Sequence, residues 1–401
     1  MNLLIAILGL GLLVLVHEAG HFFTARAVGM SPRRFYIGFP PPLVRVYRKG
    51  IEYGIGAIPL GGYVKIPGMH RPAPSDLDTH FAPALAEAPQ LVGPVEHVKR
   101  RLAEDDLEGA RRFVPELEQA LANAELSSHA ARAGRRGLNE LVDALGGDAY
   151  WRQPTWKRVA VIFAGPGANL LFAVVLFAAL FVISSGGYRL GFTPRSDSPV
   201  VASVREGWPA DRIGLMRGDR ILAINGNPVQ KQEEVSPLIE ASNGAPVSVE
   251  VRRSGQKVML GPIRPRREPR LSVPRATWES VRLTGLVTKE IGGALVRLVH
   301  GKGREDVSSP VGIVEGSSEA LDRGAETYLW VLGLLSLSLA LLNLLPLLPL
   351  DGGHIAFSLV EGIRGRAVGR EIYERVSAVG IALVLVLFFI GLSNDVGRLG
   401  E

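Results

Sequence analysis

Four long apolar stretches alternate with polar sequence along the chain. They cover approximately residues 3–27, 158–184, 328–350 and 376–393. About 20 helical residues, each rising about 1.5 Å, cross a hydrocarbon core of roughly 30 Å. Each stretch is therefore predicted to be a transmembrane helix, and the last one is close to the minimum length. A cleaved signal peptide is the alternative for the first stretch, but that stretch lacks a basic start.

A different pattern follows the first apolar stretch. Residues 50–66 alternate apolar and small residues around Gly61-Gly62, which is typical of a β-hairpin. The hairpin is too short to fold alone, so we expect it to pack beside the first helix. There it is either a simple surface hairpin or an edge strand for an extended peptide.

Residues 95–146 are charged, rich in alanine and periodic. Their apolar positions recur at helical spacing and predict a helical hairpin with one apolar face. A packing or regulatory surface is the expected role. The histidines of the wider segment have no mutual spacing that suggests a site; they are His80, His97 and His129.

The sequence between the second and third apolar stretches predicts a small soluble domain. Short apolar runs within residues 199–262 are separated by turn residues, and one helix is expected near Glu233–Ala241. Beyond this domain, residues 278–298 carry an apolar stripe interleaved with cations. That stripe fits an interfacial helix on the outer membrane face, or a helix packed on the soluble domain.

Composition supports a membrane protein with soluble parts. The 401 residues are 47% hydrophobic and 21% charged, which indicates apolar blocks between ordinary polar segments. The net charge of +6 does not indicate nucleic-acid binding, because the cations lie mostly beside apolar blocks and no recognition motif is present. With no cysteine, the chain has no disulfide, no thiolate nucleophile and no cysteine-ligated zinc.

Basic residues also predict the orientation, because cytoplasmic flanks of membrane helices are enriched in lysine and arginine. The predicted topology has both termini and residues 185–327 outside the cytoplasm, and residues 70–150 inside it. The cations that set it are Arg26, Arg33, Arg34, Arg45, Arg48, Lys49, Lys157, Arg158, Arg364, Arg366, Arg370 and Arg375.

Candidate chemistry lies inside the first predicted helix, in the sequence His17-Glu18-Ala19-Gly20-His21. Histidines four residues apart share one helical face, which suits two ligands of a zinc ion, and Glu18 is placed to act as general base. Ionisable residues cost roughly 2.5–3.5 kcal/mol each at the centre of a membrane helix, so they indicate function.

Catalytic zinc sites usually have three protein ligands. We expect Asp351 to be the third, because Pro346 and Pro349 break the third span just before it. His354 is the alternative ligand if a helix restarts there. Asn343 is a polar group in an apolar helix, and it could bond a neighbouring helix, substrate backbone or an oxyanion.

Several motifs together resemble the site-2 protease family of intramembrane zinc metalloproteases, peptidase family M50. They are the HEAGH span, the GYVK hairpin, TWKRVAVIFAGPGANL in the second span, and NLLPLLPLDGGH in the third. The chain looks most like the bacterial branch that cleaves anti-sigma factors, including its mycobacterial and actinobacterial members. The helical insert has no counterpart in this resemblance.

The resemblance implies Zn²⁺ bound by His17, His21 and Asp351, with Glu18 taking a proton from water and passing it to the leaving amine. It implies substrate handling by Asn343 and by a membrane-entering β-loop at Ile55–Lys65, including Ile58, Gly61 and Gly62. Residues 214–229 resemble the core of a PDZ domain. Gly165, Pro166 and Asn169 match the second-span motif, for which we expect a packing role.

The predicted fold is a multi-pass α-helical membrane protein with four transmembrane helices, a membrane-associated β-hairpin and one inserted α+β PDZ domain. The predicted function is intramembrane cleavage of single-span proteins, such as anti-sigma factors or remnant signal peptides, in the bacterial inner membrane after a prior external cut. A non-catalytic PDZ-bearing adaptor with structural zinc is the alternative; a secreted soluble protease fits less well. The predicted parts are 1–69, 70–150, 151–186, 187–270, 271–326 and 327–401.

Overall fold

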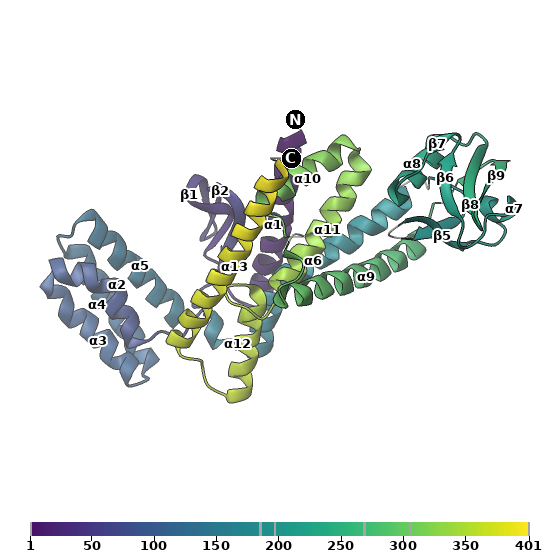
Figure 1. Cartoon of the computed structure of the whole chain (residues 1–401). Helices are drawn as coiled ribbons and strands as arrows, with labels where there is room; N and C mark the ends of the chain where they lie inside the picture. The colour runs from purple at the N-terminus through teal and green to yellow at the C-terminus, as the bar shows by residue number, and fades with distance from the viewer. Residues whose placement is uncertain (1, 184–186, 196–197, 268–269, 305–306, 400–401) are drawn as a thin grey trace. The chain divides into compact units, whose positions relative to one another are not determined.

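The computed structural model describes residues 2–183, 187–195, 198–267, 270–304 and 307–399. The chain divides into two compact units (Figure 1). One unit contains residues 1–176 and 281–401, and the other contains residues 177–280.

The described residues contain four helices long and apolar enough to cross a membrane. They are α1 (Asn2–Ala27), α6 (Thr155–Ile183), α11 (Ala325–Asn343) and α13 (Arg370–Leu399). All four correspond to predicted spans, so the four long apolar helices expected from the sequence are confirmed.

The third span is shorter than predicted. It was expected to reach residue 350, but α11 ends at Asn343 and α12 (Asp351–Arg364) begins after an irregular connection. Pro346 and Pro349 lie in that connection, where a missing N–H group and a fixed ring prevent a continuous helix. The break therefore falls before both prolines and leaves Asp351 as the first residue of a new helix.

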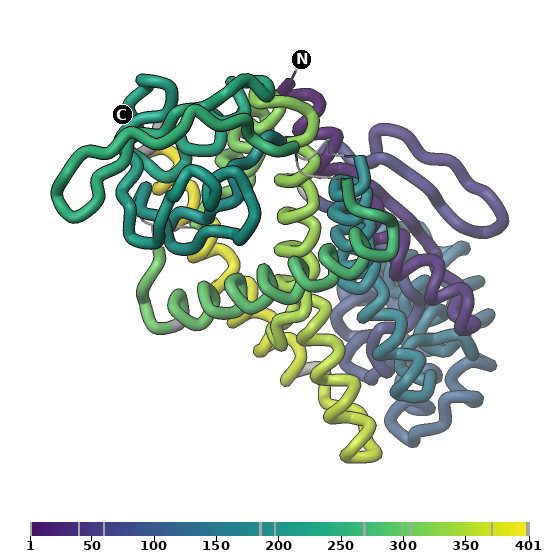
Figure 2. Tube along the Cα trace, turned by 90° about the vertical axis from the view of Figure 1, so that its right-hand side faces the viewer, coloured from purple at the N-terminus to yellow at the C-terminus, as the bar shows by residue number. Residues whose placement is uncertain are grey.

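Two long strands follow α1 and form a ribbon (Figure 2). Strands β1 (Arg34–Arg48) and β2 (Ile51–Lys65) pair as an antiparallel sheet. The chain turns at Lys49-Gly50, both with positive φ, so the prediction of a hairpin within residues 50–66 is wrong. The turn lies before Ile51 rather than at Gly61-Gly62. The partner strand of residues 51–65 is therefore the segment that precedes them in the chain, residues 34–48.

Both strands bend, which gives the first residues of β1 two neighbours. Residues 34–37 pair with residues 62–65 on one side and with residues 52–55 on the other. Among the described strands, residues 62–65 have no further partner, so they form one edge of the sheet.

The insert is a bundle of four helices rather than the predicted hairpin of two. Its helices are α2 (Pro74–Glu87), α3 (Val92–Ala103), α4 (Leu107–Asn123) and α5 (Ser128–Leu145). Burying one leucine or phenylalanine stabilises a fold by about 1.5–3 kcal/mol. Two expected helices alone would leave their apolar face uncovered, and α2 and α3 complete the core. That core includes Leu77, Phe81, Leu91, Val98, Leu117, Leu138 and Leu141.

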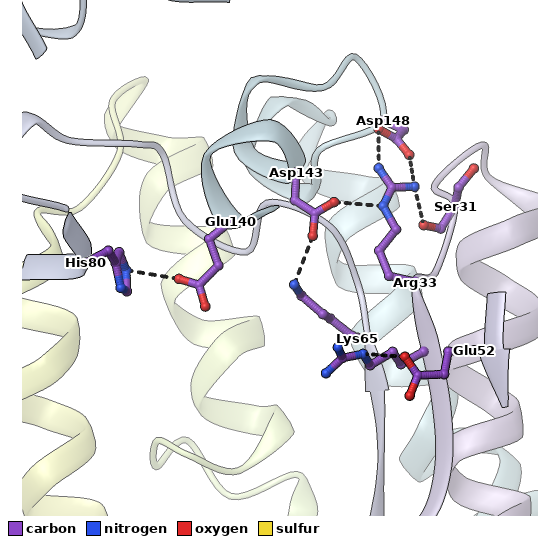
Figure 3. Close-up of polar contacts among 9 residues, drawn as sticks. Ser31, Arg33, Glu52, Lys65, His80, Glu140, Asp143 and Asp148 are labelled. Atoms are coloured by element: carbon purple, nitrogen blue, oxygen red, sulfur yellow. Dashed lines mark hydrogen bonds and ion pairs between the residues drawn. The ribbon is translucent and has the colours of Figure 1, made fainter. Parts of the chain in front are cut away.

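One carboxylate of the insert binds both ends of the β1–β2 sheet (Figure 3). Asp143 accepts a hydrogen bond of 2.7 Å from Arg33 Nε and lies 3.0 Å from Lys65 Nζ. Arg33 also pairs with Asp148 at 3.1 Å. Partial burial disfavours the charged guanidinium of Arg33, but the two carboxylates outweigh this effect and raise its pKa. The insert thus fixes where the sheet begins and ends.

The second unit contains a six-stranded antiparallel sheet in the order β4-β5-β6-β8-β9, with β7 beside β6. Its core is formed by buried aliphatic residues of alternating strand positions, such as Val201, Ile221, Val249 and Val251. The elements are β3 (Tyr188–Arg189), β4 (Phe192–Arg195), β5 (Ser198–Val204), α7 (Pro209–Arg212), β6 (Arg220–Ile224), β7 (Asn227–Pro228), α8 (Val235–Glu240), β8 (Val247–Arg253), β9 (Gln256–Ile263) and β10 (Arg266–Arg267).

Two helices lead from this unit to the third span. They are α9 (Val273–Val299), which covers the predicted amphipathic stripe, and α10 (Pro310–Asp322), which contacts α1, α11 and α13. The PDZ assignment and the predicted domain boundaries stay predictions.

Candidate metal centre

Helix α1 places two imidazoles on one buried face. His17 and His21 are one helical turn apart, and their ring centroids are 4.9 Å apart. Their Nε2 atoms are 3.3 Å apart, so the two nitrogens point to a common position. Both residues are more than nine-tenths buried, at 8% and 7% exposure.

Asp351 completes this group from a distant part of the chain. Its Oδ2 atom is 3.1 Å from His17 Nε2 and 3.4 Å from His21 Nε2. Two glycines make the approach possible, because the start of α12 packs against the preceding connection. A Cβ on Gly352 would lie 2.2 Å from the Leu344 carbonyl oxygen, and one on Gly353 would lie 2.5 Å from Leu348 N.

The donor set fits zinc. Two imidazole nitrogens and one carboxylate oxygen lie within 4.8 Å of one another, and three N/O ligands are typical of catalytic zinc sites. Asp351 Oδ2 is buried and makes no hydrogen bond of good geometry to any described residue. His21 Nδ1 lies 2.8 Å from the Val161 carbonyl oxygen, so it donates there and leaves the Nε2 lone pair for a metal.

Glu18 lies between the metal centre and the sheet. Its carboxylate accepts a hydrogen bond from the backbone of Val64. A Cβ on Gly62 would lie 2.9 Å from Glu18 Cγ, so the edge of β2 passes directly beside this side chain. The candidate general base therefore has a β-strand edge as its immediate neighbour.

Asn169 of α6 contacts the metal centre from behind. It is fully buried, and its amide nitrogen lies 3.5 Å from His17 Nδ1, while its amide oxygen has no described partner. Amide oxygen and nitrogen are assigned from the hydrogen-bond network. With the amide turned over, the oxygen accepts from His17 Nδ1–H and leaves Nε2 free for zinc.

Glycines allow α1 and α6 to approach closely at this point. A Cβ on Gly165 would lie 2.2 Å from His21 Nε2, and one on Gly20 would lie 2.2 Å from the Ala164 carbonyl oxygen. Sequence reasoning gave Gly165 and Asn169 a packing role and missed their contacts with the ligands. The sequence feature that could have indicated these contacts is Gly-Pro-Gly-Ala-Asn at residues 165–169. Packing of an apolar helix does not by itself require a polar Asn among small residues.

The other predicted residues lie near the site or on its approaches. Asn343 is the last residue of α11, and its amide donates to the Leu339 carbonyl oxygen at 3.0 Å. Ile58 is 44% exposed on β2, and Gly61 has a φ of 121°. The substrate roles of Asn343, Ile58, Gly61 and Gly62 stay predictions.

His354 lies one turn beyond Asp351 but outside the ligand group. Its Nδ1 atom is buried without a described partner, and its ring centroid is 6.0 Å from that of Tyr373. The structure brings Asp351 rather than His354 to the two histidines.

Comparison with known proteins agrees with this chemistry. Residues 5–387 match peptidase family M50. The chain is 30% identical over 423 residues to a protein of Agrobacterium fabrum described as a zinc metalloprotease, covering 98% of this chain and 95% of the relative. It is 29% identical to a protein of the same description from Neisseria meningitidis, covering 99% of both chains.

A relative from Enterococcus faecalis described as the protease eep is 26% identical, with 97% of both chains covered. These matches extend across nearly the whole chain, metal centre and apolar helices included. The chain therefore belongs to peptidase family M50, the site-2 protease family, and is a zinc metalloprotease and a membrane protein.

Proposed function

We propose that this protein hydrolyses peptide bonds of single-span membrane proteins within the bilayer. The observation that carries the proposal is the location of the His17, Asp351 and Glu18 side chains at a helix with the length and composition of a membrane span. Ionisable groups are costly inside a membrane helix and mark functional sites there.

The residues of the chain divide the reaction between them. His17, His21 and Asp351 would hold zinc, which supplies a Lewis acid that polarises the scissile carbonyl. Glu18 accepts a proton from the attacking water and delivers it to the amine that leaves when the C–N bond breaks. The carboxylate is thereby regenerated. The edge of β2 beside Glu18 binds the unwound substrate as an added strand.

The proposed topology places the Arg26 end of α1 in the cytoplasm of a bacterial inner membrane, with both termini and the second unit outside. Cations at the ends of α1 and α6 and between α12 and α13 support this orientation. Water then reaches the metal centre from the cytoplasmic side. We assign residues 187–270 as a PDZ domain, on the resemblance of residues 214–229 to a PDZ core.

The proposed substrates are anti-sigma factors or remnant signal peptides already shortened outside by another protease. The PDZ domain would exclude bulky external domains or bind a newly exposed C-terminus, and we favour exclusion. A short external remnant is what both roles require.

Replacing Glu18 by Gln tests the function. The variant keeps the size of the side chain and all three ligands but removes the base, so it should retain zinc and lose cleavage by about 10²–10⁴-fold. The measurement is cutting of a single-span reporter in lipid vesicles, with zinc quantified in the same samples. Cleavage at the wild-type rate by Glu18→Gln would reject the proteolytic mechanism, and the adaptor with structural zinc would replace it.

A further inference from the structure

The insert and the end of β2 enclose a cavity outside the metal centre. Its volume is about 410 Å³, and it lies between the C-terminal end of β2, helix α2 and helix α5. Polar and apolar groups share its wall. Its lining includes Lys65, Met69, Asp76, Phe81, Glu140 and Asp143.

The cavity is continuous with the edge of the sheet beside Glu18. Gly62 and Val64 contact Glu18, whereas Tyr63, Val64 and Lys65 already line the cavity. Extended chain advances about 3.3 Å per residue, so Gly62 to Lys65 spans about 10 Å. A peptide that lies along this edge with one bond near Glu18 therefore enters the cavity about three residues later.

Carboxylates outnumber Lys and Arg in the cavity wall, which also includes His70 and His80. Three carboxylates, those of Asp76, Glu140 and Asp143, line it together with one ammonium group, that of Lys65. Asp143 is balanced by Lys65 at 3.0 Å and by Arg33. Glu140 pairs with His80 at 3.0 Å and has no Lys or Arg partner among the described residues (Figure 3). Its charge is available to a cation that enters.

Apolar side chains stand beside these carboxylates. Met69, Leu77 and Phe81 also line the cavity. Lysine and arginine bury a methylene stem against such surface while their charged end reaches a polar group. A cavity wall that contains both apolar side chains and carboxylates matches both parts of a basic side chain.

We propose that this cavity binds the basic residues that flank a substrate's transmembrane segment on its cytoplasmic side. The inference rests on the proposed function and orientation, and it gives the insert a role in selecting substrates. Membrane spans are flanked by Lys and Arg on the cytoplasmic side. These basic residues lie only a few positions beyond the part of the span that is in the bilayer core. A bond cut beside Glu18 near that end places those residues at the cavity.

The test compares two single-span reporters in vesicles, one with Lys and Arg after the span and one with Gln at the same positions. The measured quantity is the ratio of kcat/KM for the basic reporter to that for the neutral one. Glu140→Gln should lower this ratio on the order of threefold to tenfold at low salt. Glu116→Gln is the matched control, because Glu116 also pairs with a histidine of the insert, His97 at 3.2 Å, but does not line the cavity.

An unchanged ratio in Glu140→Gln, or an equal fall in the Glu116→Gln control, would overturn the proposal. Binding of a fluorescent Lys/Arg-rich hexapeptide provides a second measurement that needs no cleavage. The Glu18→Gln protein should bind it several-fold more tightly than the Glu18→Gln/Glu140→Gln protein, and equal affinities would also reject the site. If the wild-type protein cut neither reporter, the proposed proteolytic function would be rejected. The peptide-binding measurement would still show whether the cavity binds basic residues.

Discussion

Gly165 of α6 faces His21 of α1 so closely that a methyl group on Gly165 would lie 2.2 Å from the Nε2 atom of His21. That nitrogen is the one directed at Asp351, so the metal-binding side of the imidazole lies against the second span. The second span thus belongs to the metal centre although it supplies no ligand.

We therefore expect Gly165→Ala to displace the His21 ring and lower zinc affinity by at least about tenfold, as losses of supporting groups around a metal do. Zinc content after graded chelator treatment measures the effect. Gly167→Ala is the control in the same helix, since its Cβ would meet only the half-exposed Phe163 ring at 3.2 Å. Equal zinc retention in both variants would contradict this reading of the contact.

Removing the side chain of Asn169 should weaken the site without touching a ligand. Asn169→Ala leaves His17 Nδ1 without its neighbour, and loss of such partners costs about 10–100-fold in metal affinity. Asn169→Asp keeps an acceptor oxygen and should retain more zinc than Asn169→Ala. The opposite order would show that the amide nitrogen, rather than an oxygen, faces His17.

The identity of the third ligand follows from zinc stoichiometry in two variants of α12. Asp351→Ala should purify with little zinc, because two imidazoles alone bind it weakly. His354→Ala should keep about one zinc per chain, since His354 lies outside the ligand group. Zinc lost only from His354→Ala would reverse the assignment.

Acid should destabilise the second unit through Asp219. Two hydrogen bonds from Arg253, at 2.6 and 2.8 Å, lower the pKa of Asp219, and the Met216 N–H bond lowers it further against the effect of burial. A carboxyl whose pKa is lowered in the folded state stabilises that state above its ordinary pKa. This stabilisation is lost as pH falls through the lowered value.

Asp219→Asn should remove about 1.5–3 kcal/mol of that stability near neutral pH and flatten its dependence on acid. Hydrogen exchange of residues 198–253 in the full chain measures both quantities. Glu250→Gln is the control, because Glu250 pairs with an exposed Lys257 and exposed pairs contribute about 0–1 kcal/mol. A pH profile shared by wild type and Asp219→Asn would rule out the carboxylate as the source.

The sequence was most informative where one local pattern determines geometry. Histidines four residues apart on a helix share a face whatever surrounds them, so the pairing of His17 with His21 was predictable. Pro346 and Pro349 likewise predicted a helix break just before Asp351, although the third span ends earlier than expected. Apolar length alone was sufficient to predict all four spans.

Features that depend on contacts between distant segments were not predictable in the same way. Strand β1 pairs with β2 through backbone groups, and nothing in residues 50–66 alone identifies residues 34–48 as the partner. The close approach of Gly165 to His21 depends on how two helices pack, and the spacing of apolar residues within one helix does not predict that packing. The four-helix core of the insert was half predicted, because the apolar stripe of α2 is short.

The ligands of the metal centre are also separated in time during synthesis. His17, Glu18 and His21 leave the ribosome first, and Asp351 follows only after the second and third spans have been made. A nascent or truncated chain ending before residue 351 would hold the base and two imidazoles but could not assemble the three-ligand site. Because the ligand set stays incomplete until Asp351 has been added, we expect zinc-dependent activity to begin only after α12 has been synthesised.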